Sequence, residues 1–153
     1  MSDMKASLRA LSIVLQTEGK ANFFLRVPLG LIFFVHGAQK LFGWFDGNGL
    51  EATAQWMSTQ LGGDGLMWAV LGGGAELLGG VALMLGLLVR PAALTLAIVM
   101  MVAIRAVHWE HGLLLQDGGY EFALSLLAGA AALLFGGAGA WSLDRLLTRI
   151  YKD

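Results

Sequence analysis

Two long apolar stretches constrain the fold of this chain more than any other feature of its sequence. Residues 66–89 contain Glu76 as their only ionised side chain, and residues 122–140 contain none. Each stretch can cross a hydrocarbon core of about 30 Å as an α-helix, in which the backbone satisfies its own hydrogen bonds. Residues 22–41 and 92–107 are also apolar, although they carry a few polar side chains. We therefore predict an all-α integral membrane protein, folded as a four-transmembrane-helix bundle.

The composition agrees with this class and excludes others. Hydrophobic residues make up 57% of the 153 residues, whereas charged residues make up only 14%. The net charge of −1 gives no reason to expect a nucleic-acid partner, so the lipid bilayer is the first partner that we predict. Because the chain has no cysteine, disulfides, thiol catalysis and thiolate metal sites are excluded. Any redox role must therefore use another group or a bound cofactor.

The basic residues predict the orientation in the membrane. Four spans place both termini on one side, and only Lys40 and Arg105 lie on the other side. Basic residues favour the cytoplasmic side, so we expect both termini to be cytoplasmic. The eight basic residues on the terminal side are Lys5, Arg9, Lys20, Arg26, Arg90, Arg145, Arg149 and Lys152.

Shorter segments flank or interrupt the predicted transmembrane domain, residues 22–144. Residues 1–21 carry apolar residues at helical spacing and are predicted as an amphipathic cytoplasmic surface segment, with a partly ordered terminus as the alternative. Residues 145–153 are predicted as a basic cytoplasmic tail. Between the first two spans, Leu50, Ala54, Met57 and Leu61 predict a short amphipathic helix in the first periplasmic loop. This helix lies either in the membrane interface or over the mouth of the bundle as a lid.

Polar side chains gather in the outer half of the predicted bundle, whereas the inner half has almost none. With a helical rise of about 1.5 Å per residue, Glu76 lies near the midplane. His36 lies at mid-membrane or slightly outside it, and Lys40 is one turn further out on the same face. The remaining outer groups are Arg105, His108, Tyr120 and Glu121.

Glu76 is the most costly of these groups to bury. An ionised carboxylate near the bilayer midplane must face the interior of the bundle and be paired or protonated. Arg105, Lys40 and His36 are its candidate partners, and an internal ion pair that only fixes helix register is the alternative to a functional site. Glycines at intervals of seven in the same span allow another helix to approach closely, within the chain or in a homodimer through glycine-rich faces.

Several of these residues together resemble a known family. The sequences HGAQKLFGWF (residues 36–45), ELLGG (76–80) and GGYE (118–121), with the Arg90 turn and His108, are similar to the DoxX family of small bacterial inner-membrane proteins. The resemblance covers about residues 26–144. It implies a four-helix, multi-pass protein of the bacterial cytoplasmic (inner) membrane, and some relatives are linked to thiosulfate:quinone oxidoreductases or to oxidative-stress and sulfur-handling complexes. Its polar set falls on His36, Gln39, Lys40, Glu76, His108, Tyr120 and Glu121.

These observations lead to one main functional hypothesis. We expect a membrane oxidoreductase component that binds a quinone or similar small redox molecule in the periplasmic half, linked to sulfur-compound oxidation or oxidative-stress handling. His36, Lys40 and Glu76 are the predicted catalytic residues, because quinone carbonyls need hydrogen-bond donors and a proton route. The predicted substrate- or cofactor-binding residues are Gln39, Arg105, His108, Tyr120 and Glu121.

Other functions remain open at this point. Lys40 and Arg105 could instead attract a small anion at the outer mouth. His36, Glu76, His108 and Glu121 could hold a metal or small molecule for binding or transport, although no metal site is assigned because these residues do not form a short motif. The chain could also anchor a soluble partner enzyme to the membrane, with its polar centre purely structural.

Overall fold

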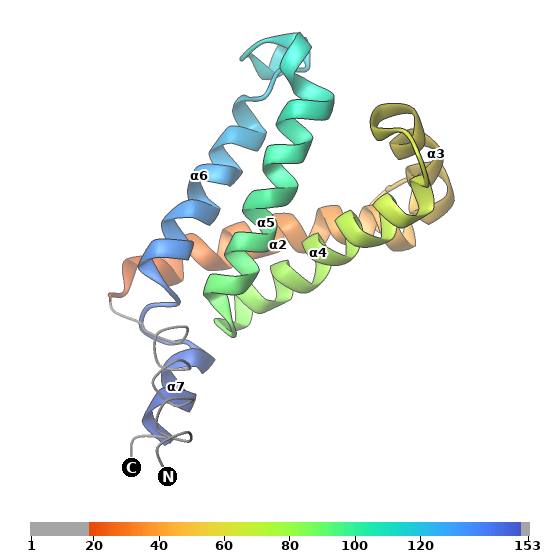
Figure 1. Ribbon diagram of the computed structural model, residues 1–153. Helices are drawn as coiled ribbons and strands as arrows, with labels where there is room; N and C mark the ends of the chain where they lie inside the picture. Colours follow the sequence, from red (N-terminus) through yellow and green to blue (C-terminus); the bar gives the residue numbers. More distant parts are fainter. Residues whose placement is uncertain (1–18, 151–153) are drawn as a thin grey trace, which may run out of the picture.

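The computed structural model describes residues 19–150, and every element in this range is helical (Figure 1). Four apolar helices form the body of the protein: α2 (Ala21–Phe42), α4 (Gly65–Leu85), α5 (Val89–Ala103) and α6 (Glu121–Gly136). The short helix α3 (Gly49–Leu61) joins α2 to α4, and α7 (Leu143–Ile150) follows α6. The all-α prediction is confirmed for the described residues. Most of the predicted surface segment at residues 1–21, and the last three residues of the predicted tail, lie outside them.

Within residues 19–150, three helices are long and apolar enough to cross a membrane. They are Ala21–Phe42, Gly65–Leu85 and Val89–His111. The last of these continues α5 through a π-helical turn, η1 (Ile104–His108), and a 3-10 turn, η2 (Trp109–His111). Helix α6 has 16 residues and is the shorter, fourth apolar helix.

Glycines allow α2 and α4 to pack at close range. A Cβ atom added to Gly30 would lie 2.6 Å from the carbonyl oxygen of Gly80, and one added to Gly37 would lie 2.7 Å from that of Gly73. Such distances leave no room for a side chain, so the two backbones touch. The predicted close-packing face of this span is therefore used within the chain. The homodimer through glycine-rich faces stays a prediction.

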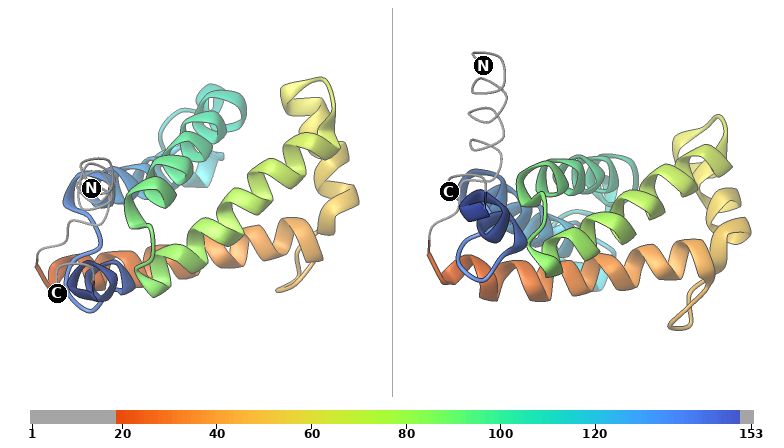
Figure 2. Two further views of the ribbon diagram at one scale, coloured as in Figure 1. Left: turned by 60° about the horizontal axis from the view of Figure 1, so that its bottom comes forward. Right: turned by 90° about the horizontal axis from the view of Figure 1, so that it is seen from below.

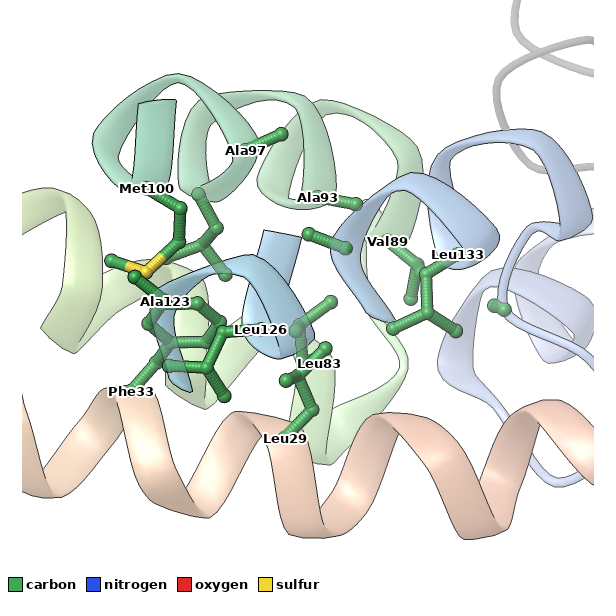
Figure 3. Close-up of a cluster of buried hydrophobic side chains, with 13 residues drawn as sticks. Leu29, Phe33, Leu83, Val89, Ala93, Ala97, Met100, Ala123, Leu126 and Leu133 are labelled. Atoms are coloured by element: carbon green, nitrogen blue, oxygen red, sulfur yellow. The ribbon is translucent and has the colours of Figure 1, made fainter. Parts of the chain in front are cut away.

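Helices α5 and α6 form a second pair that diverges from the first. A tight turn with Gly86 at φ 68° and Leu88 at φ 49° connects α4 to α5. From this turn α4 and α5 spread apart, which both Figure 1 and Figure 2 show. We call this end of the molecule the turn end, and the opposite end, where α2 ends and α4 begins, the loop end. A cluster of buried apolar side chains holds the two pairs together; it includes Phe33, Leu83, Met100, Leu126 and Leu133 (Figure 3).

A buried arginine stabilises the turn end. Arg26 is 1% exposed, and its guanidinium donates hydrogen bonds to four backbone carbonyls near the ends of α4 and α6. Helix C-termini leave carbonyls without intrahelical partners and favour a cation. The expectation that this half of the bundle has almost no polar groups is therefore wrong. The acceptors are the carbonyls of Leu83, Met84, Ala138 and Trp141.

Asp144 complements Arg26 at the same end. Its carboxylate is 1% exposed and accepts the backbone N–H groups of Leu88 and Val89, at distances of 2.7 and 3.0 Å. These donors lie at the start of α5, where a negative charge is favourable. Burial raises the pKa of the Asp144 carboxyl above its ordinary value of 3.8, although both hydrogen bonds and the charge of Arg26 act in the opposite direction. Residues 145–150 of the predicted tail belong to α7.

Candidate functional site

A cavity of about 620 Å³ lies between α4 and α5 toward the loop end. We call it the α4–α5 cavity. Apolar side chains form most of its walls, and Phe33, Met100 and Leu126 of the buried cluster close it on the core side. Four of the polar residues singled out from the sequence line it: His36, Lys40, Glu76 and His108.

An ion pair between α2 and α4 forms the polar part of the wall. The ammonium nitrogen of Lys40 lies 2.6 Å from Oε1 and 2.5 Å from Oε2 of Glu76. Glu76 is 2% exposed and the Lys40 side chain 27% exposed, so the carboxylate is the buried member of the pair. Of the three partners that the sequence allowed for Glu76, the structure selects Lys40. Glu76 faces the bundle interior, and the pair carries no net charge.

The Lys40 ammonium keeps one donor for a ligand. A lysine ammonium has three N–H groups and no acceptor. The hydrogen bonds of Lys40 within residues 19–150 all go to Glu76, so one N–H remains without an acceptor in this part of the chain. Because Lys40 also lines the cavity, a ligand there can accept this hydrogen bond.

His36 lies one helical turn before Lys40 on the same face of α2. Its half-buried ring contacts that of Phe122, with a centroid distance of 6.3 Å, and lines the cavity. Neither ring nitrogen has a hydrogen-bond partner among the described residues. A histidine of this kind is available to donate to, or accept from, a molecule in the cavity.

A π-helical turn brings His108 to the cavity. Residues 95, 99, 103 and 106 follow the cavity-facing side of α5 at helical spacing, and the wider turn of η1 moves His108 toward that side. Turns of this type occur often at functional sites. The Nδ1 atom of His108 lies 2.8 Å from the carbonyl oxygen of Gly118, so Nδ1 donates this hydrogen bond. In the neutral imidazole, Nε2 is then an acceptor.

These cavity residues lie within a recognised family region. The sequence model of the DoxX family matches residues 21–109, which is more than half of the chain. The chain belongs to the DoxX family. The matched region contains His36, Lys40, Glu76 and His108, whereas Tyr120 and Glu121 lie beyond it.

Two relatives of this DoxX-family chain agree with a membrane protein. One, from Mycobacterium tuberculosis, is described as an uncharacterized membrane protein; it is 33% identical over 155 residues, with 89% of this chain and 87% of the relative covered. An uncharacterized protein of Haemophilus influenzae is 36% identical over 78 residues, which cover 51% of this chain and 52% of the relative. The chain thus spans about half the length of the Haemophilus relative. No solved structure matches this DoxX-family chain.

Four other predicted site residues lie near the loop end but do not line the cavity. Gln39 donates to the carbonyl oxygen of Phe45 at 3.1 Å and so stabilises the loop after α2. The ring of Tyr120 stacks on that of Trp109, and the Glu121 carboxylate accepts the N–H of Leu115 at 2.6 Å. Arg105 is exposed and has no ion pair or hydrogen bond within residues 19–150. Their binding roles stay predictions.

Helix α3 contributes cavity residues that the sequence did not suggest. Trp56, Met57, Gln60 and Leu61 all line the α4–α5 cavity. Of the two placements left open by the sequence, this position favours a helix that covers the cavity. Only Met57 and Leu61 belong to the periodic apolar pattern; Trp56 and Gln60 lack such a signal.

The geometry does not assemble metal ligands in the described region. Among residues 19–150, no three histidine, aspartate or glutamate side chains come close enough together to hold an ion. Glu121, one member of the suggested ligand set, is turned to the α5–α6 loop by its bond to Leu115.

Proposed function

We propose that this DoxX-family protein binds a quinone or a similar neutral redox molecule in the α4–α5 cavity, as a membrane component of an oxidoreductase. The observation that carries the proposal is the combination of apolar walls with the unused hydrogen-bonding groups of His36 and Lys40. Ligand sites are mostly apolar cavities of about 300–1,000 Å³ with a few convergent polar groups. The α4–α5 cavity has both properties.

Charge balance favours a neutral ligand over a small anion. The Glu76 carboxylate already neutralises Lys40, and Arg105 does not line the cavity. An anion would therefore enter an apolar space without a compensating net positive charge, which is costly. A quinone carbonyl needs only a hydrogen-bond donor.

The proposed chemistry assigns separate roles to the three central residues. The free N–H of Lys40 donates to one quinone oxygen, and His36 donates to or exchanges a proton with the ligand. Glu76 holds the Lys40 ammonium in place and is the nearest proton acceptor behind it. Reduction of the quinone to the quinol consumes two electrons and two protons; the protons reach the quinone oxygens from Lys40 and His36, and water replaces them at the part-exposed Lys40 side chain. The electrons come from a partner subunit or from the substrate, as in oxidation of a sulfur compound. In the handling of oxidative stress the direction is reversed, and the quinol gives two electrons and two protons to an oxidant.

The proposal includes a membrane topology. The protein is placed in the bacterial cytoplasmic (inner) membrane, with α2, α4, α5 and α6 as four spans and both termini in the cytoplasm. The shorter α6, about 24 Å long at 1.5 Å per residue, completes the bundle beside three full-length spans. The loop end, with α3 and the α4–α5 cavity, then faces the periplasm.

Ligand binding to the purified protein tests the proposal. A quinone added in detergent should raise the melting temperature, because a ligand at about 100 times its Kd stabilises the folded state by about 2.7 kcal/mol. The variant His36→Ala should lose most of this shift. His111→Ala is the matched control, since His111 bonds to the backbone of Val107 and does not line the cavity. Absence of both a shift and a co-purifying quinone in the unaltered protein would refute the proposal.

A second candidate function is a membrane anchor for a soluble partner enzyme. One observation favours it: Lys40 and Glu76 satisfy most of each other's hydrogen-bonding needs, so the pair can serve the fold alone. Under this reading, a complex with His36→Ala or Glu76→Gln should keep full activity. Loss of activity in a variant that still folds would favour the binding site.

A further inference from the structure

The α4–α5 cavity has an opening on its side. Cavity-lining residues on both diverging helices are exposed at the molecular surface: Trp68 and Leu71 on α4, and Thr95, Ile98 and Val102 on the continuous α5 face. Ile98 is 49% exposed. Helix α4 and the continuous helix Val89–His111 are both long and apolar enough to span a bilayer, so this surface faces lipid in the proposed topology. The cavity is thus continuous with the apolar part of the membrane.

The turn end of the cavity is closed, and α3 covers part of the loop end. At the loop end, α3 lies tightly against the start of α4, because a Cβ atom added to Gly65 would lie 2.8 Å from the Ser58 Cβ. Its residue Met57 is buried and lines the cavity. At the turn end, the buried apolar cluster fills the space between the helices (Figure 3). The side between α4 and α5 is therefore an apolar route to His36 and Lys40, whereas the cavity borders the exposed Trp56 and Gln60 at the loop end.

We infer that the ligand is an amphiphile with a long apolar tail, and that it moves between the bilayer and the cavity through the opening between α4 and α5. This inference rests on the proposed function. The polar head reaches His36 and Lys40, while the tail stays in the opening, beside Ile98 and Leu71. Apolar walls keep the tail out of water at every stage of the movement. Only the head contacts the polar part of the cavity, and the ion pair of Lys40 with Glu76, which has no net charge, favours a neutral head.

Thiol labelling locates the tail. Because the chain has no cysteine, Ile98→Cys carries a single thiol on the opening. Leu78→Cys is the control, since Leu78 is 71% exposed on α4 and does not line the cavity. The probes are decylubiquinone, which carries a tail, and duroquinone, which does not. Both quinone rings are fully substituted, so the cysteine thiol has no unsubstituted ring carbon to which it could add.

The two quinones should protect the thiols differently. In vesicles at saturating quinone, decylubiquinone should slow labelling of Ile98→Cys by a lipid-soluble maleimide about tenfold relative to duroquinone. Labelling of Leu78→Cys should not change. If both quinones raise the melting temperature but protect Ile98→Cys equally, the inference is overturned while the proposed function stands. If neither quinone binds, both are overturned.

A second pair of variants tests the route. Ile98→Trp narrows the opening and should lower the association rate of decylubiquinone from vesicles about tenfold. Leu94→Trp is the matched control, because Leu94 is 47% exposed on the same helix and does not line the cavity. Both positions face outward, so both variants should fold. Equal association rates in the two variants would contradict passage between α4 and α5.

Discussion

The Lys40–Glu76 pair gives the most quantitative test of the structure. In Lys40→Met, the Glu76 carboxylate loses both of its hydrogen bonds and stays 2% exposed between α2 and α4. Exposed ion pairs contribute about 0–1 kcal/mol, whereas breaking a buried pair by removing one partner costs about 3–5 kcal/mol. The range for a buried pair applies here, because the Glu76 carboxylate is buried. We therefore expect Lys40→Met to lower the free energy of unfolding by about 3–5 kcal/mol.

The double variant separates the pair from its parts. Replacing both charges, in Lys40→Met with Glu76→Leu, leaves no uncompensated group, and such replacements of buried pairs are often neutral or stabilising. The double variant should thus unfold within about 1 kcal/mol of the unaltered protein, with a coupling energy of about 3 kcal/mol. Unfolding is followed by helix content in mixed micelles with increasing denaturing detergent.

The control uses the other cation of the loop end. Arg105→Met removes an exposed charge that has no partner within residues 19–150, so its effect should stay within about 0.5 kcal/mol. If Lys40→Met costs no more than Arg105→Met, the buried pairing of Glu76 with Lys40 is refuted. If Arg105→Met is the costly change, Arg105 is the true partner of Glu76.

Four further predictions concern packing, the turn end and topology. Gly37→Ala should destabilise the protein by more than about 2 kcal/mol, because the added Cβ would lie 2.7 Å from a carbonyl oxygen of α4. A Cβ added at Gly74 meets open space, so Gly74→Ala should be neutral or stabilising by up to about 1 kcal/mol in the same unfolding assay. Arg26→Met should cost about 3 kcal/mol or more by leaving buried carbonyls without donors, while the exposed Arg149→Met should change stability by less than about 0.5 kcal/mol. Since burial raises the pKa of Asp144, the folded protein binds the proton of this carboxyl more tightly than the unfolded chain does. The free energy of unfolding should therefore fall as the pH rises from 3.8 toward the raised pKa. Asp144→Asn, measured across the same pH range, should show no such fall. A reporter enzyme fused to either terminus should give a cytoplasmic signal, and a periplasmic signal would contradict the proposed topology.

The positions of the helices were predictable because they depend on local sequence. A run of apolar residues longer than a bilayer core can satisfy its backbone in lipid only as a helix, so 66–89 and 22–41 predicted α4 and α2 within a few residues. The inward orientation of Glu76 followed from the cost of exposing a carboxylate to lipid. The glycine spacing likewise indicated a close helix contact. The family resemblance, read from short motifs, is confirmed by the match over residues 21–109.

The composition of the site depends on how the helices meet. Sequence placed the polar groups of the loop end at similar depths, but depth does not give the direction of a side chain around its helix or the angle between two helices. The contact of α2 with α4 through glycines brings Lys40, and not Arg105, to Glu76. The π-helical turn of η1 directs His108 to the cavity, and the apolar periodicity of the sequence does not predict such a turn.

The sequence by itself therefore determined a helical membrane protein of the DoxX family with a carboxylate turned inward. Tertiary structure decided which polar groups share a cavity, that Arg26 and Asp144 stabilise the opposite end, and that α4 and α5 diverge to leave an opening. The physical reason is the range of the interactions involved. Helix formation and the inward or outward orientation of a residue depend on hydropathy and periodicity within one segment. Side-chain pairing and cavity shape depend on contacts between segments far apart in the chain.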